Sequence, residues 1–97
     1  MGYEFDWDPM KAQSNIQKHG ISFEEASTVF DDPFALYRND PDHSLLEDRF
    51  IILGMSIYQK LLVVSFDERP PSTRLISARR ATRNERRKYE EKDHGND

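Results

Sequence analysis

Two short apolar runs, close together in the chain, constrain the fold more than any other feature. Residues 49–55 (RFIILGM) and 61–66 (LLVVSF) are rich in strand-forming residues and too short for buried helices. The link around residues 58–60 is short, so we expect these runs to pair as a β-hairpin. A turn over residues 67–73 holds two prolines, which cannot donate to a ladder, and a third strand over 74–79 should follow it. The sequence therefore predicts an antiparallel meander.

Side chains of the third predicted strand should alternate between the two faces of the sheet. On this basis Leu75, Ser77 and Arg79 should share one face of the strand. The other face should carry Arg74, Ile76, Ala78 and Arg80.

Helix-capping residues mark three predicted helices. Asp8 and Pro9 suit the first two positions of a helix that should end at Gly20, since glycine readily takes the left-handed conformation. A capping box beginning at Ser22 opens a helix that should run to about residue 30. A second box, beginning at Thr82, opens the last helix.

The remaining segments complete an α+β fold. The aromatic and acidic residues at 3–7 alternate as in a half-buried strand, and residues 34–37 form a second short strand. Residues 38–48 have a turn composition and should form an exposed loop that carries His43. The predicted order is β-α-α-β-β-β-β-α, a mainly antiparallel sheet with two N-terminal helices and one C-terminal helix.

Length and composition favour one intracellular domain. The 97 residues fit a single domain over 1–97, with residues 93–97 as a frayed tail. No apolar run is long enough to span a membrane, and the first residues lack the features of a signal peptide. Cysteine is absent, which fits a reducing compartment, so we expect a cytoplasmic protein without membrane association.

The charge is distributed unevenly along the chain. Residues 1–48 hold eleven acids and three bases, whereas residues 49–97 hold eleven bases and seven acids. Residues 74–88 alone carry seven bases and one acid, on a predicted strand that runs directly into a helix. This pattern fits one face for a polyanion and another for a basic partner, although both halves could simply keep the surface soluble.

Arginine and histidine are the candidate functional residues. Arginine clamps phosphate oxygens in a bidentate way, and Arg49, Arg74, Arg79 and Arg80 lie near the ends of neighbouring predicted strands. Each of them could equally be an ordinary surface charge. The three histidines lack the paired spacing of a metal site, so no metal or cofactor is expected.

Cleavage of RNA without a metal needs only a few groups. A base takes the proton of the 2′-hydroxyl, cations stabilise the phosphorane, and an acid protonates the leaving oxygen. His19 and His43 could act as base or acid, although a lone histidine is more often a surface or capping residue.

Two motifs at a fixed separation resemble a known family. The segments FDWDP and KHGISFEEA in the first half, with RF and RLISAR in the second, are similar to BrnT-type toxins over about residues 3–90. The resemblance implies a RelE-like fold and the toxin of a type II toxin–antitoxin pair. It further implies an endoribonuclease that cleaves mRNA, either free or on the ribosome, and halts translation. The implied partner is a BrnA-like ribbon-helix-helix antitoxin, and operator DNA would be bound only through the complex of the two proteins.

The resemblance and the basic stretch together give a set of site residues. Arg49 and Arg79 are expected to hold the scissile phosphate, with His19 or His43 as acid or base. Arg80, beside Arg79, completes the catalytic set. The residues expected to bind substrate are Lys18, Arg74, Arg83, Arg87 and Tyr89.

Two other functions remain open at this point. The chain could be a toxin fold that has lost catalysis and only binds an antitoxin or nucleic acid as a regulator. It could also bind nucleic acid directly through residues 74–88, which would make its affinity strongly salt-dependent.

Overall fold

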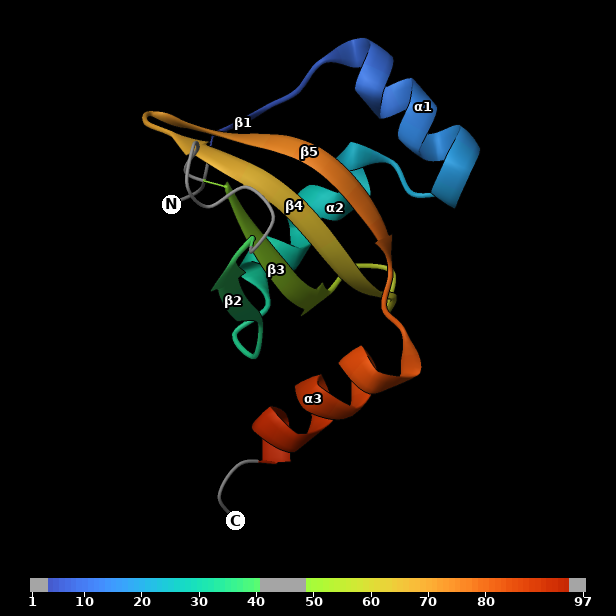
Figure 1. Cartoon of the computed structure of the whole chain (residues 1–97), viewed down its shortest axis with the longest axis vertical. Coiled ribbons are helices and arrows are strands. Elements are labelled where there is room, and N and C mark those ends of the chain that lie inside the picture. Colours follow the sequence, from blue (N-terminus) through green and yellow to red (C-terminus); the bar gives the residue numbers. More distant parts are fainter. Residues whose placement is uncertain (1–3, 41–48, 95–97) are drawn as a thin grey trace.

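A computed structural model of the chain describes residues 4–40 and 49–94. These residues form a five-stranded sheet in the order β1-β5-β4-β3-β2 (Figure 1). β1 pairs with β5 in parallel, and the other neighbours are antiparallel, so the predicted α+β class is confirmed. The elements are β1 (Phe5–Asp6), α1 (Pro9–His19), α2 (Phe23–Ser27), the 3₁₀ helix η1 (Thr28–Asp31), β2 (Leu36–Asn39), β3 (Arg49–Met55), β4 (Leu61–Arg69), β5 (Ser72–Arg80) and α3 (Arg83–His94).

The predicted helix ends are confirmed by their hydrogen bonds. The Asp8 side chain accepts from the Met10 N–H at the start of α1, and Gly20 ends this helix with φ of 71°. At the start of α3, the Thr82 hydroxyl accepts from the Glu85 N–H while the Glu85 carboxylate accepts from the Thr82 N–H. Local sequence therefore determines where these two helices begin.

The second helix differs from its prediction. α2 ends at Ser27 and continues as η1, because the chain tightens into a 3₁₀ turn ahead of Asp32. Ser22 caps α2 as expected, but the Glu25 carboxylate does not complete the box. It accepts instead from the Ser56 hydroxyl at 2.7 Å and lies 3.5 Å from the Lys60 ammonium, which ties α2 to the β3–β4 turn.

The predicted turn over residues 67–73 is wrong in its extent. β4 continues through Arg69 and β5 begins at Ser72, so only Pro70 and Pro71 lie outside the ladder. Glu68 faces Thr73 across the two strands, and their side chains are hydrogen-bonded at 2.9 Å. The strands extend because the polar residues here pair with one another. The first strand, in contrast, is limited to Phe5–Asp6 within the described residues.

The sheet has two faces with different coverings. We call the side that packs on α2 and η1 the α2 face; it contributes Ile52, Leu62, Val64, Phe66 and Leu75 to the main core. The opposite side, the α3 face, contributes Leu53, Leu61 and Val63 to a smaller core that includes Tyr89 of α3. Figure 1 shows α3 at one end of the sheet, so α3 itself covers only that end of the α3 face.

A β-bulge in β5 changes which residues share a face. Ser65 pairs with Ser77 but Phe66 pairs with Leu75, which leaves Ile76 as an extra residue on β5. As a result Leu75 and Ala78 both enter the main core, although they are three residues apart. The predicted regular alternation over 74–80 is therefore wrong. Arg74 pairs with Asp67 and Arg79 with Val63, so the bulge places both arginines on the α3 face.

The α1 helix lies along β5, where a side chain completes the sheet. Asn15 is 5% exposed, and its amide accepts from the Ala78 N–H and donates to the Ala78 carbonyl, at 3.0 and 2.9 Å. The same amide group donates to the Ile21 carbonyl at 2.9 Å. Asn15 thus takes the place of a neighbouring strand beyond the end of β1, and it holds the turn after α1 as well.

Candidate functional site

One carboxylate organises the charged end of the α3 face. Asp67 of β4 is 4% exposed, and its Oδ1 accepts from Arg49 Nε of β3 at 2.9 Å. Its Oδ2 accepts from Arg69 Nη2 at 3.1 Å. Arg74 of β5 lies opposite Asp67 in the ladder and reaches Asp6 at 3.5 Å. Because Asp67 fixes the side chain of Arg49, this arginine is held in place before any ligand arrives.

The other end of the same face carries Arg79. Its Nη1 and Nη2 each donate to one oxygen of Glu85 at 2.9 Å, and Nη1 also donates to the Arg80 carbonyl at 3.2 Å. These three bonds use three of the five N–H donors of a guanidinium. Arg79 therefore keeps donors for a second anion while Glu85 fixes its position at the start of α3.

A row of arginines results, which we call the arginine strip: Arg49, Arg74 and Arg79 on the α3 face, with Ser65 and Ser77 between them. Asp67 and Val63, which face the two ends, are four residues apart on β4, a distance of roughly 13 Å at the rise of a strand. Because the serine side chains are short, they do not project between the arginines. This geometry suits an extended anionic chain with more than one phosphate.

Hydrogen bonding and charge shift the pKa values of the Arg79–Glu85 pair. The bidentate bonds from Arg79 lower the pKa of Glu85 to about 2, against an opposing effect of its partial burial. The bond from Glu85 raises the pKa of Arg79 above its ordinary value. Glu85 is consequently ionised at neutral pH and, with so low a pKa, is a poor general base.

This pair predicts a specific pH dependence of stability. The folded-state pKa of Glu85 is lowered, so its contribution is present above the unfolded pKa, near 4.5, and disappears as the pH falls towards 2. The Arg79 side chain is 42% exposed, which limits the contribution to about 1 kcal/mol. We expect Glu85→Gln to unfold more easily in urea than the parent at pH 7, and equally at pH 2. A difference that persists unchanged at pH 2 would contradict the assignment.

The predicted site residues on α1 lie at a groove beside β5. Lys18 and His19 are exposed in the last turn of α1, and together with Ser77 they line a groove of about 210 Å³. Ser77 also belongs to the arginine strip, so His19 lies at the border of the strip. The predicted partner in acid–base chemistry, His43, falls outside the described residues.

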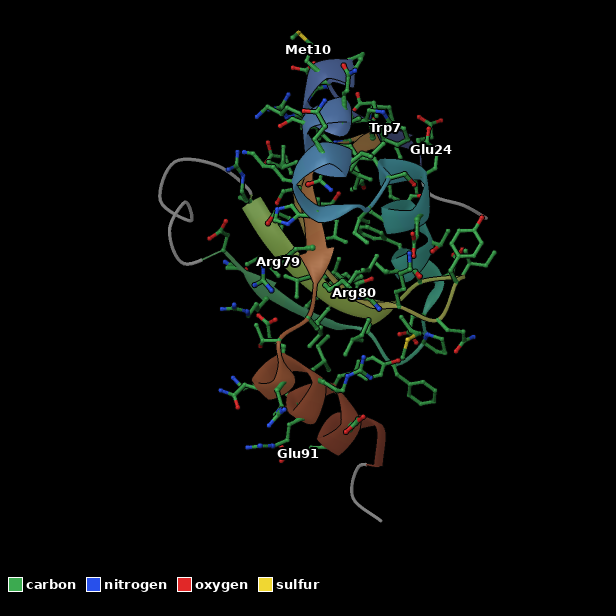
Figure 2. The ribbon with its side chains drawn as sticks, turned by 90° about the vertical axis from the view of Figure 1, so that its right-hand side faces the viewer. Trp7, Met10, Glu24, Arg79, Arg80 and Glu91 are labelled. Carbon is green, nitrogen blue, oxygen red and sulfur yellow. The ribbon has the colours of Figure 1, made fainter. Side chains whose placement is uncertain are left out.

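Other predicted site residues lie away from the strip. Arg80 pairs with Leu62 and so belongs to the α2 face; Figure 2 shows Arg79 and Arg80 on opposite sides of the end of β5. Arg83 and Arg87 are exposed and lie about half a helical turn from Glu85, on the side of α3 directed away from the sheet. The structure thus separates these three arginines from Arg49, Arg74 and Arg79.

Tyr89 occupies a structural position. It is 6% exposed in the smaller core, and its hydroxyl donates to Asp32 Oδ2 at 2.7 Å. The other oxygen of Asp32 accepts from the Phe34 N–H, and Oδ2 also accepts from the Met55 N–H. Tyr89 therefore connects α3 to the segment after η1, a role that its place on a polar helix did not reveal.

Several residues of the site were not found from the sequence. Asp67 was assigned to a turn, and its alternation with Ser65 and Val63 along β4 was the available signal. Glu85 was identified only as a capping residue, although it also holds Arg79. Arg69 joins the site only because β4 extends beyond the predicted turn.

The geometry can be compared with known proteins. A family model described as the ribonuclease toxin BrnT of type II toxin–antitoxin systems matches residues 7–85. The chain belongs to this family. The matched range runs from just after β1 to the first turn of α3, so it includes all three arginines of the strip and Glu85. The predicted resemblance and the predicted class of enzyme, a ribonuclease toxin, are confirmed by this match.

A solved structure supports the fold. The crystal structure of the Brucella abortus ribonuclease toxin BrnT is similar over 84% of this chain and 99% of that chain, with a TM-score of 0.66 and 24% sequence identity. At this identity the likeness shows the fold. A search of curated proteins gives no match.

Metal-binding clusters and membrane-spanning helices are both absent from the described residues. In residues 4–40 and 49–94, no three His, Cys, Asp or Glu side chains come together in a way that could hold a metal ion. Within the same ranges, none of the helices combines the length and the apolar character needed to cross a bilayer.

Proposed function

We propose that this chain arrests translation by cleaving mRNA, and that a BrnA-like ribbon-helix-helix antitoxin neutralises it. The proposal rests on membership of the BrnT ribonuclease toxin family and on one observation: the bulge at Ile76 brings Arg74 and Arg79 to the face that carries Arg49. Three guanidinium groups on the α3 face provide the positive charge that a phosphodiester requires.

The strip supports cleavage that uses the 2′-hydroxyl of the RNA itself. A base removes the proton of this hydroxyl, its oxygen attacks the adjacent phosphorus, and the bond to the 5′-oxygen breaks. An acid then protonates the leaving oxygen, and a 2′,3′-cyclic phosphate remains on the other fragment. One of Arg49 and Arg79 would stabilise the additional negative charge of the phosphorane, and the other would hold a neighbouring phosphate, since the two lie at opposite ends of the strip and both are held by carboxylates before the substrate binds.

Histidine would provide the proton transfer. His19 borders the strip through the groove that it shares with Ser77, and histidine is the side chain best suited to proton transfer near neutral pH. His43 is the second candidate from the sequence. We therefore expect His19→Ala to lower the cleavage rate, and replacement of both histidines to lower it further.

Expression experiments test the proposed function. The chain is induced in bacterial cells alone and with a neighbouring antitoxin gene, and the 5′ ends of cellular mRNA are mapped after induction. We expect growth arrest with new mRNA ends from the chain alone, and neither with the antitoxin. Formation of the complex without any new RNA end would instead show a binding module that has lost catalysis.

Asp67 provides a more specific prediction. Asp67→Asn retains the shape of the side chain but removes the charge that orients Arg49 Nε. We expect kcat for RNA cleavage to fall about tenfold or more, with a smaller change in KM, because the guanidinium is less precisely placed in the transition state. If Asp67 acts through Arg49, adding Asp67→Asn to an Arg49→Lys variant should cost little more activity. Additive losses would indicate a separate structural effect.

A further inference from the structure

The groove between α1 and β5 extends the site beyond the arginine strip. One face of α1 supplies Lys11, Lys18 and His19, and the bulge residue Ile76 and its neighbour Ser77 form the opposite wall. Lys11 and Lys18 are seven residues apart, so they lie on the same side of the helix, roughly 10 Å from one another. The groove is therefore lined by two lysines and a histidine, and it meets the strip at Ser77.

The lysines of this groove differ from the arginines of the strip in their ion pairs. In the described part of the chain, no carboxylate forms an ion pair with Lys11 or Lys18. The contrast with the strip is clear, since Arg49, Arg74 and Arg79 each pair with an acid. The two lysines thus remain available to an external anion.

The position of Lys11 also argues for a ligand. It lies in the first turn of α1, where the helix dipole is positive and a cation is unfavourable, and the nearby N-cap carboxylate of Asp8 accepts from the Met10 N–H without forming an ion pair with Lys11. Lys18, in the last turn, is explained by the dipole alone. The dipole does not explain Lys11, because a neutral residue at this position would make the helix more stable.

From these observations we infer that the groove between α1 and β5 binds backbone phosphates of the RNA segment that flanks the cleaved bond. This inference rests on the proposed function, because it takes the substrate to be RNA. The lysines are too far apart to share one phosphate, so Lys11 and Lys18 would each contact a different one. RNA would pass from the strip across the edge of β5 at the bulge, where Ser77 belongs to both surfaces.

Substrate length provides the test. Cleavage rates and equilibrium binding are measured for the parent and for Lys11→Ala, Lys11→Glu and Lys18→Ala, with a short RNA that fills only the strip and with an RNA extended on both sides. We expect each alanine variant to raise KM for the longer RNA about three- to tenfold and to leave the short RNA unaffected. The salt dependence of binding should weaken by about 0.7 in log–log slope for each lost contact. Arg86→Ala, which removes a charge from α3, is the matched control.

Stability separates this inference from a structural role. Because Lys11 opposes the helix dipole, Lys11→Ala should leave the melting temperature unchanged or slightly higher while RNA affinity falls. Lys11→Glu with parental affinity for the longer RNA would overturn the inference, as would an equal loss on both RNA lengths. If Lys11→Glu weakened only the complex with the antitoxin, the groove would belong to that protein instead.

Failure of the proposed function would be distinguishable. If the parent protein cleaves no RNA, but binds the longer RNA with a salt dependence that Lys11→Ala reduces, the RNA-binding groove is supported and the proposed nuclease activity is contradicted. If the parent cleaves both RNAs and the Lys11 and Lys18 substitutions have no effect, the nuclease activity is supported and the RNA-binding groove is contradicted.

Discussion

Replacing Arg79 by alanine is expected to abolish growth arrest and to lower RNA cleavage at least about a hundredfold, as is replacing Arg49. Both guanidinium groups are fixed before substrate binds, Arg49 by Asp67 and Arg79 by Glu85. Loss of either one would leave the phosphorane or the neighbouring phosphate without its cation. The measurements are colony growth after induction and the cleavage rate of the purified protein, with Arg86→Ala as the control.

Folding must be checked separately for the Arg49 variant. Removing the Arg49 side chain leaves the buried Asp67 with Arg69 as its remaining ion-pair partner among the described residues, which costs stability as well as activity. The double variant Arg49→Ala/Asp67→Asn removes this unpaired charge and should regain stability while remaining inactive. Arg49→Lys and Arg79→Lys retain the charge but lack the planar fork, and they should restore only part of the activity. Full toxicity of both alanine variants would refute the site.

The largest expected effect on stability comes from Asn15. Asn15→Ala leaves the N–H of Ala78 and the carbonyls of Ala78 and Ile21 without their buried partner. Unsatisfied buried backbone groups cost about 1–3 kcal/mol each, so we expect a loss of roughly 3 kcal/mol and a melting temperature lower by more than about 10 °C. Urea unfolding followed by circular dichroism measures this loss.

Two variants make the result specific. Gln17→Ala alters an exposed position on the same helix and should change the stability little. Asn15→Asp retains an acceptor for the Ala78 N–H but cannot donate to either carbonyl when ionised, so it should also be destabilised. An Asn15→Ala protein as stable as the parent would mean that the hydrogen bonds from Asn15 of α1 do not stabilise the edge of β5.

Local signals in the sequence were sufficient for both ends of α1 and for the start of α3. Asp8, Gly20 and Thr82 act through bonds to residues two to four positions away, so their roles could be predicted without knowing the fold. The hairpin of β3 and β4 follows in the same way from two apolar runs and a short link.

Long-range pairing could not be predicted in the same way. Asn15 and Ala78 are sixty-three residues apart, and nothing near either residue indicates that they are hydrogen-bonded. The bulge at Ile76 likewise arises from the register between β4 and β5, not from a residue type that favours it. The arginines could therefore be predicted as a group of candidates, whereas the face on which each one lies could only be seen in the structure.

The bulge at Ile76 also suggests how the sequence of β5 can change during evolution. Many side chains could occupy position 76, since the bulge depends on the presence of an extra residue in β5 and not on the side chain of that residue. Deletion of it would rotate Ser72 to Leu75 to the opposite sides of the sheet, which would bury Arg74 and expose Leu75. In this strand, selection should therefore act more strongly on the number of residues than on the identity of the extra one.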